Sequence, residues 1–203
     1  MWSNGRVWER IAERLEGRIV VLEALRAEHE EPLWEAARDP RIWEATNHLI
    51  SSRDDFGRWW EDARDEQLQG IAAVFATLER ASGRPIGSTR YGTLRPEHLS
   101  LEIGWTWLNP SAWGTGANVE AKYLMLRRAF EELGCVRVEF KTSARNERSR
   151  AALAALPAQF EGIHRKHMLV RGGERRDSAW YSIVDDEWPA VKAGLERRLE
   201  RKG

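Results

Sequence analysis

The sequence has little cysteine, little lysine and no long apolar run. Its single cysteine, Cys135, can form no internal disulfide and no zinc site built from cysteines. No apolar stretch approaches the ~18 residues that a membrane-spanning helix needs. The first ten residues, MWSNGRVWER, lack the apolar core of a signal peptide. We therefore expect a protein of a reducing, cytoplasmic compartment that has no transmembrane span.

An excess of either charge is also absent. The 32 Lys and Arg residues balance the 32 Asp and Glu residues, and only five of the cations are lysines. Acidic and basic residues alternate along the chain, whereas a surface for nucleic acid or membrane usually shows a basic stripe. The charge pattern therefore argues against nucleic acid and against a membrane as partners.

Apolar and aromatic residues, in contrast, are plentiful enough for a folded core. Of the 203 residues 42% are hydrophobic and eleven are tryptophans, a composition that argues against disorder. One domain commonly takes ~100–200 residues, and no linker-like or repeated segment divides this chain. We predict a single domain over 1–203, with an N-terminal extension over 1–16 and a C-terminal helix over 186–203.

Hydrophobic patterning predicts a mixed α/β fold, not a regular array of βαβ units. Strand patterns occupy 17–23, 71–78, 86–93, 99–107 and 136–140, and two further strands flank the turn at 171–173. Helix patterns occupy 27–38, the segment after an N-cap at 51–52, a segment ending at Gly134, and 147–156 before Pro157. A last helix begins near Asp186.

The strand over 99–107 alternates regularly. The residues predicted on its apolar face are Leu99, Leu101, Ile103, Trp105 and Trp107. Those predicted on its other face are Ser100, Glu102, Gly104 and Thr106.

A glycine-containing loop follows this strand and leads directly into an apolar helix. It reads Trp113-Gly114-Thr115-Gly116-Ala117-Asn118. Glycines at a helix N-terminus let main-chain N–H groups approach an anion, and the helix dipole favours phosphate. The loop lacks the Lys-Ser/Thr of a P-loop and does not fit the dinucleotide fingerprint. Alone, the pattern fits either a plain turn or a phosphate site.

The surrounding segment, EIGWTWLNPSAWGTGANVEAKYLMLRRAFEELGCVRVEFKTSARNERSRAAL, resembles the GNAT superfamily of acyl-CoA N-acyltransferases. Within it, the chain looks most like the RimJ/RimL type, the ribosomal-protein N-terminal acetyltransferases and their relatives. The resemblance runs from Gly17 to about Trp188 and is most specific at 113–130 and 146–149. It implies an α+β domain with a splayed, mostly antiparallel central sheet flanked by helices. It also implies acetyl-CoA as the acyl donor, with no metal.

The resemblance assigns a place to each part of the donor. The pyrophosphate would lie on the loop, and the pantetheine arm would lie between the strands 99–107 and 136–142. The cofactor-binding residues that it implies are Thr106, Trp107, Leu108, Trp113, Gly114, Thr115, Gly116, Ala117, Asn118, Asn146 and Ser149.

Three departures from the family pattern stand out. Trp113 occupies the usual Arg or Gln position of the loop, and Asn118 occupies that of a small residue. Pro157 replaces the glycine that often ends the later helix. Because proline cannot adopt a positive φ, that helix must end differently.

The catalytic residues that we predict are Glu102 and Ser149. Glu102 would accept the proton of the acceptor amine, either directly or through water. The tyrosine that serves many GNAT enzymes as general acid falls at Leu153, so Ser149 is the nearest substitute and Tyr181 a more remote one.

Each of these assignments has a purely structural alternative. Glu102 could be a salt-bridged residue, Asn146 a helix cap and Ser149 an ordinary residue of a helical first turn. His164 and His167 lack the spacing of metal ligands, so we predict no metal site.

We predict a cytoplasmic, acetyl-CoA-dependent N-acetyltransferase that works by direct transfer in a ternary complex. Its partners would be acetyl-CoA and a primary amine, which belongs to a peptide N-terminus or to a small molecule. The chain could also form a homodimer. The alternative is a non-catalytic acyl-CoA-binding module, which Trp113 and the missing tyrosine favour. A nucleic-acid binder rich in Arg and Trp is a third interpretation, and the balanced charge opposes it.

Overall fold

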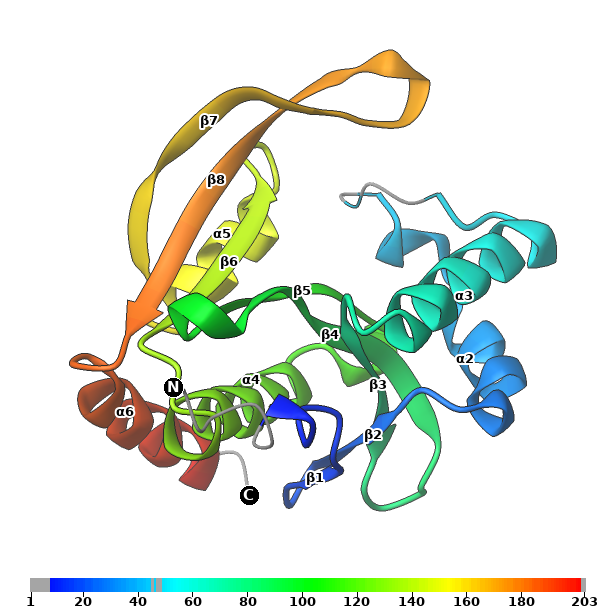
Figure 1. Cartoon of the computed structure of the whole chain (residues 1–203). Coiled ribbons are helices and arrows are strands. Elements are labelled where there is room, and N and C mark those ends of the chain that lie inside the picture. The colour runs from blue at the N-terminus through cyan, green and yellow to red at the C-terminus, as the bar shows by residue number, and fades with distance from the viewer. Residues whose placement is uncertain (1–7, 45, 47–48, 202–203) are drawn as a thin grey trace.

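An eight-stranded sheet forms the centre of the molecule (Figure 1). The computed structural model describes residues 8–44, 46 and 49–201. The spatial order of the strands is β1-β2-β3-β4-β5-β6-β8-β7, and every neighbouring pair is antiparallel except β5 and β6. The strands are β1 (Leu15–Glu16), β2 (Val20–Ala24), β3 (Ala73–Glu79), β4 (Pro85–Arg95), β5 (Ser100–Leu108), β6 (Arg137–Ser143), β7 (Gln159–Leu169) and β8 (Arg175–Val184). The predicted α+β fold with a mostly antiparallel sheet is confirmed.

Helices cover both faces of the sheet. The α-helices are α2 (Glu30–Ala37), α3 (Arg53–Leu68), α4 (Ala117–Arg127), α5 (Glu147–Ala154) and α6 (Trp188–Glu200). One core cluster packs α4, α5 and α6 against one face, and a second packs α2 and α3 against the other (Figure 1). None of the described helices is both long and apolar enough to span a bilayer.

Local sequence signals explain several element boundaries. Ser52 caps α3 as predicted, because its Oγ accepts from the N–H of Asp55 at 3.1 Å. Gly134 has a φ of 69°, the left-handed conformation expected where a helix ends. Before it, residues Arg128–Glu132 continue α4 as a π-helical turn, which the apolar spacing did not reveal.

Two predicted strands begin too early. The main-chain N–H of Ile71 still bonds to the carbonyl of Glu66 in α3, so β3 starts only at Ala73. Residues 17–19 form a turn instead of the start of β2. The buried carboxylate of Glu120 accepts from the N–H groups of Arg18, Ile19 and Val20 and holds that turn.

The alternation predicted for 99–107 is wrong at both ends. Leu99 precedes β5 in a left-handed conformation. Opposite the single residue Thr89 of β4, strand β5 places two residues, Trp105 and Thr106, and Trp105 has a φ of 51°. This β-bulge shifts the side-chain phase. Trp105 therefore lies on the Glu102 side of the sheet, while Thr106 turns to the α4 side.

The bulge changes what the end of the strand contacts. Leu101 and Ile103 pack in the cluster under α4, whereas Trp107 packs in the opposite cluster with α3. The tryptophan stripe predicted on one face is thus divided between two faces.

Strands β5 and β6 part after a short parallel contact. They pair only through Ser100–Arg137, Leu101–Val138 and Glu102–Glu139, and beyond those pairs they diverge. In Figure 1 the part of the sheet formed by β6, β7 and β8 rises away from the part formed by β3, β4 and β5. The predicted splay of these two strands is confirmed.

Candidate functional site

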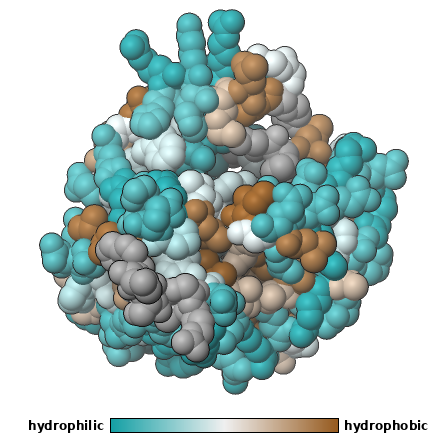
Figure 2. Space-filling view, in the orientation of Figure 1, coloured by the Kyte–Doolittle hydropathy of each residue, from teal (hydrophilic) through white to brown (hydrophobic). Residues whose placement is uncertain are grey.

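A cavity of about 500 Å³ opens where β5 and β6 part. Its walls come from the separated ends of the two strands, the N-terminal half of α4, the first turns of α5, and the segment around Trp43. Figure 2 shows apolar residues gathered in a hollow in the middle of this face, with hydrophilic residues around it. Because segments far apart in the sequence converge here, the cavity is the candidate functional site.

The loop before α4 forms one end of the cavity. Gly114 and Gly116 line it with φ values of 76° and 101°, which residues with a side chain adopt only under strain. A Cβ at Gly114 would meet no protein atom within 4 Å. The first turn of α4 directs there main-chain N–H groups for which the helix itself has no acceptor. This end of the cavity suits an anion.

Asn118 adds a polar atom to the same end. Its Oδ1 is buried and has no hydrogen-bond partner among the described residues. An unsatisfied buried acceptor costs about 1–3 kcal/mol. A ligand in the cavity that donates a hydrogen bond would remove that cost.

A positively charged side chain of α5 lies next to the loop. The guanidinium of Arg148, in α5, lies 4.1 Å from the ring centroid of Trp113, whose Nε1 donates to the carbonyl of Leu108 at 2.9 Å. The loop lacks a basic residue of its own at position 113. The stacked pair places a positive charge beside it instead.

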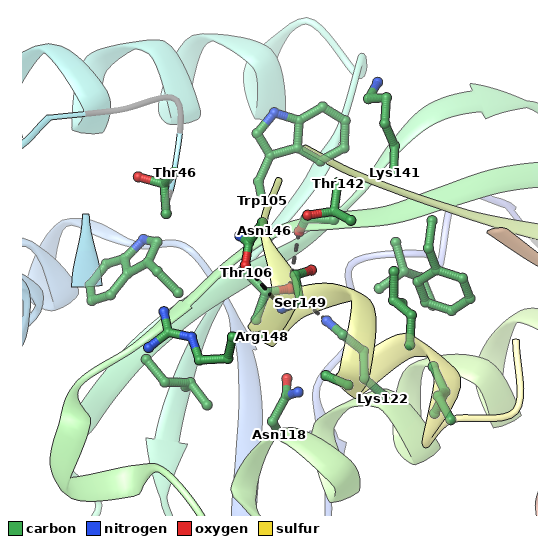
Figure 3. A pocket seen from close by; sticks show the side chains of 18 of the residues that line it. Thr46, Trp105, Thr106, Asn118, Lys122, Lys141, Thr142, Asn146, Arg148 and Ser149 are labelled. Atoms are coloured by element: carbon green, nitrogen blue, oxygen red, sulfur yellow. Dashed lines mark hydrogen bonds between the residues drawn. The ribbon is translucent and has the colours of Figure 1, made fainter. Parts of the chain in front are cut away.

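A buried amine lies one helical turn beyond Asn118. Lys122 is only 7% exposed, and its Nζ donates to Oγ1 of Thr106 at 2.6 Å and to Oγ1 of Thr89 at 3.1 Å (Figure 3). No carboxylate of the described chain forms an ion pair with it. Burial lowers the pKa of the Lys122 ammonium from 10.5 to about 7.

The start of α5 faces the same space. Asn146 caps this helix, because its Oδ1 accepts from the N–H of Ser149 at 3.0 Å. The side chains of Asn146 and Ser149 both line the cavity. The capping role considered for Asn146 is therefore present, and it leaves the residue beside the cavity.

Glu102 lies at the other end of the cavity and is 2% exposed. Its Oε2 accepts from Oγ1 of Thr93 at 3.0 Å and from Nζ of Lys141 at 3.2 Å. Lys141 also lies 5.7 Å from the ring centroid of Trp105 and 5.2 Å from that of Trp180. This carboxylate is buried and paired, as the salt-bridge alternative expected, and it also lines the cavity.

Aromatic rings line the cavity at Trp107, five residues along β5 from Glu102. The rings of Trp43 and Trp59 contact Trp107 with centroid separations of 5.3 Å and 5.5 Å. Met168 and Arg176, from β7 and β8, also line the cavity. The cavity thus has two chemically distinct ends, which we call the loop end (residues 114–122) and the Glu102 end (Glu102, Lys141 and Trp105).

Comparison with known proteins identifies the fold. Residues 20–158 match the model of the acetyltransferase (GNAT) domain. The chain belongs to the GNAT acetyltransferase family. A GCN5-related N-acetyltransferase from Brucella melitensis is 31% identical, with a TM-score of 0.85 over 92% of this chain and 85% of that one. A structure from T. thermophilus, described as a candidate acetyltransferase, is 39% identical, with a TM-score of 0.78 over 92% and 97% of the two chains.

A curated enzyme shares part of this similarity. The FsC-acetyl coenzyme A-N(2)-transacetylase of Aspergillus fumigatus is 28% identical over 143 residues, which are 70% of this chain. The matched region spans 55% of that enzyme's length. A ribosomal-protein-S5-alanine acetyltransferase from Vibrio fischeri is 18% identical with a TM-score of 0.67, a likeness of fold alone.

Most site residues predicted from the GNAT resemblance line this one cavity. They are Glu102, Thr106, Trp107, Leu108, Trp113, Gly114, Gly116, Asn118, Asn146 and Ser149. Thr115 and Ala117 do not. The hydroxyl of Thr115 turns back to the carbonyl of Ala112, and Ala117 is buried in the core under α4.

Sequence reasoning missed Lys122 and Arg148. Lys122 follows Asn118 by four residues, a spacing that places both on one face of a helix. It is also one of only five lysines and has apolar or aromatic neighbours on both sides in the sequence, so the signal was present. The contact of Arg148 with Trp113 depends on the tertiary fold.

The tyrosines of the chain are all engaged elsewhere. The hydroxyls of Tyr91 and Tyr123 donate to the carbonyl of Met125 and to Glu196, and that of Tyr181 accepts from Arg150. These are the three tyrosines of the sequence, and none of them lines the cavity. Tyr181, considered above as a remote acid, packs in the sheet.

Proposed function

We propose that this GNAT protein transfers an acetyl group from acetyl-CoA to a primary amine by direct attack in a ternary complex. The observation that carries the proposal is one cavity with an anion-binding end and a carboxylate end, opened by the parting of β5 and β6. A donor that spans it would place its phosphates at one end and its acyl group toward the other.

The residues present fit such a donor. Gly114 leaves room beside the N-terminus of α4, and the unpartnered Oδ1 of Asn118 can accept a hydrogen bond. Main-chain N–H groups of the loop would hold the pyrophosphate, and Trp113 with Arg148 would flank it. The Oδ1 of Asn118 would accept from an N–H or O–H group of the pantetheine arm. Thr106, Asn146 and Ser149 would contact the pantetheine arm.

At the Glu102 end, the carboxylate can take the proton that an amine must lose. The ring of Trp105, which lines the cavity beside Lys141, supports an acceptor that carries apolar groups near the amine. Within the family, we extend the proposal to a RimJ/RimL-like, cytoplasmic enzyme whose acceptor is a peptide N-terminus or a small amine. A single domain over 1–203 and a homodimer remain predictions.

The test combines calorimetry with an acceptor screen. We expect acetyl-CoA to bind with a stoichiometry of one per chain, and free CoA thiol to appear with at least one amine or N-terminal peptide. Binding without thiol release for any acceptor would favour the non-catalytic acyl-CoA-binding module. Absence of binding would contradict both.

A further inference from the structure

The chemistry proposed for the cavity calls for a proton donor near its centre. The transfer leaves a thiolate, which departs more easily when it receives a proton. The three tyrosines are committed elsewhere, and Ser149 has a hydroxyl that is too weak an acid to do this alone. Another proton donor is therefore needed.

Lys122 occupies the right place for that role. It lies on α4 one turn beyond Asn118, and its partner Thr106 belongs to the strand that carries Glu102. A donor molecule that runs from the loop toward Glu102 must pass it. Figure 3 shows Asn118 and Lys122 rising from the same helix toward Thr106 and Ser149.

The hydrogen bonds of Lys122 leave one proton available. An ammonium has three N–H groups, and two of them donate to the hydroxyls of Thr89 and Thr106. No third acceptor lies within hydrogen-bond range in the part of the chain that the structure describes. The third N–H of this side chain, which is more than nine-tenths buried, is free for a ligand in the cavity.

The other charged groups around the cavity do not compete for this role. Those that line it are Glu102, Lys141, Arg148, Arg176 and Arg198. Glu102 is an acceptor that pairs with Lys141, and a guanidinium group does not serve as a proton donor in proteins. The surroundings of Lys122 lower its pKa to about 7 through burial alone, so it can lose a proton near neutrality.

We propose that Lys122 is the proton donor to the departing sulfur, an assignment that rests on the function proposed above. As the amine nitrogen forms its bond to the carbonyl carbon, the carbon–sulfur bond breaks and its electron pair goes to sulfur. The Lys122 ammonium protonates that sulfur, and Glu102 takes the proton that the amine nitrogen loses. Exchange with solvent then restores Lys122 to ammonium and Glu102 to carboxylate.

The test compares Lys122→Met and Lys122→Arg with the wild type, and uses Lys192→Met as a control for the loss of a lysine outside the cavity. Lys192 lies on α6 and pairs with Glu131. For each protein, kcat and kcat/KM are measured from pH 6 to 10 with the acceptor found in the screen. Acetyl-CoA affinity is measured by calorimetry and folding by thermal unfolding.

For the wild type we expect activity to rise as the amine loses its proton and to fall again as Lys122 does. Lys122→Met should lower kcat at pH 7 by about 10²-fold, the lower end of a general-acid contribution, and should lose the alkaline limb. Lys122→Arg should recover part of kcat through its charge, again without an alkaline limb. Lys192→Met should match the wild type.

A Lys122→Met protein with wild-type kcat, or with the alkaline limb intact, would overturn the assignment while leaving the proposed function in place. If that variant does not fold, the pH profile of Lys122→Arg decides the same question. Absence of acetyl-CoA binding by the wild type would overturn the proposed function, and the role of Lys122 with it.

Discussion

Two lysines line the same cavity in opposite electrostatic surroundings. At the Glu102 end, Lys141 pairs with a buried carboxylate at 3.2 Å and lies over two tryptophan rings. At the loop end, Lys122 contacts only hydroxyl groups. The first is one half of a neutralised pair, and the second is a buried charge whose cost depends on pH. A lysine therefore stabilises the folded protein at the Glu102 end and destabilises it at the loop end.

Removal of each lysine should therefore have opposite effects on stability. Lys141→Met leaves the carboxylate of Glu102 buried without its cation, and we expect the free energy of unfolding to fall by about 3 kcal/mol. Lys122→Met removes an unpaired buried charge, and at pH 7 we expect that free energy to rise by about 2 kcal/mol. Urea denaturation of both variants measures the two changes in stability. A loss of stability in both variants would contradict the prediction.

The effect of Lys122 should also depend on pH in a defined direction. Its folded-state pKa of about 7 lies below the unfolded value of 10.5, so between these values unfolding takes up a proton. The wild type should therefore gain up to about 1.4 kcal/mol per pH unit over that window relative to Lys122→Met. The advantage of the Met variant should shrink as the pH rises from 7 to 10. A constant difference would show that Lys122 does not titrate there.

The next largest effect is expected when Glu102, the carboxylate that pairs with Lys141, is replaced. Glu102→Gln keeps the shape and the hydrogen bond from Thr93 but removes the base, so we expect kcat to fall by about 10²-fold. Acetyl-CoA affinity should be unchanged, and the deficit in kcat relative to the wild type should narrow at high pH as free amine accumulates. The matched control is Glu139→Gln, a buried carboxylate paired in register with Glu102 but bound by Arg95 and Arg137 outside the cavity. An effect confined to Glu139→Gln would place the base there.

Substitutions in the glycine loop should change the affinity for acetyl-CoA and leave kcat unchanged. Gly114→Ala adds a methyl group to space that the protein leaves empty, and we expect acetyl-CoA affinity to fall about tenfold, or about 1.4 kcal/mol. Gly83 is a suitable control, because it has a similar φ of 68° in the turn between β3 and β4 and equally open surroundings. Gly83→Ala should carry the same backbone strain with no change in affinity. Equal losses of affinity would mean that strain alone accounts for both.

The smallest effect that we predict belongs to the cation beside the loop. Arg148→Gln should weaken acetyl-CoA binding about threefold, near the 0.5–1 kcal/mol typical of an exposed cation–π contact. The remaining affinity should depend less on salt, since one charge facing the phosphates is gone. Arg145→Gln provides the comparison, because Arg145 is exposed and pairs with Glu174 away from the loop. If acetyl-CoA binding by Arg148→Gln and by the wild type had the same salt dependence, Arg148 would not interact with the phosphates of the donor.

The glycine loop before α4 could be recognised from the sequence because it is encoded locally. Neighbouring residues specify the glycines before the helix, the cap at Asn146 and the succession of strands along the chain. These patterns led to the correct family. The Glu102 end is assembled from tertiary contacts. Lys141, Trp180 and Arg176 reach it from β6 and β8, whose positions depend on the packing of the sheet, and no local pattern specifies that packing.

The same distinction explains the errors in β5. Alternation is a local rule that holds only while two strands pair residue by residue. The left-handed backbone at Trp105 breaks the rule, although neither Trp105 nor Thr106 belongs to the residue types that usually mark such a conformation. The side-chain phase of Thr106 and Trp107 could therefore not be read from the sequence.

The bulge at Trp105 also makes the number of residues in β5 matter more than their identity. Between the register pairs Arg90–Gly104 and Ser88–Trp107, β5 has two residues where β4 has one. A deletion of Trp105 or Thr106 would remove the bulge and one of its two side chains, either the ring beside Lys141 or the hydroxyl to which Lys122 donates. A substitution at either position would leave the spacing intact. Natural variation in this stretch should therefore keep its length fixed.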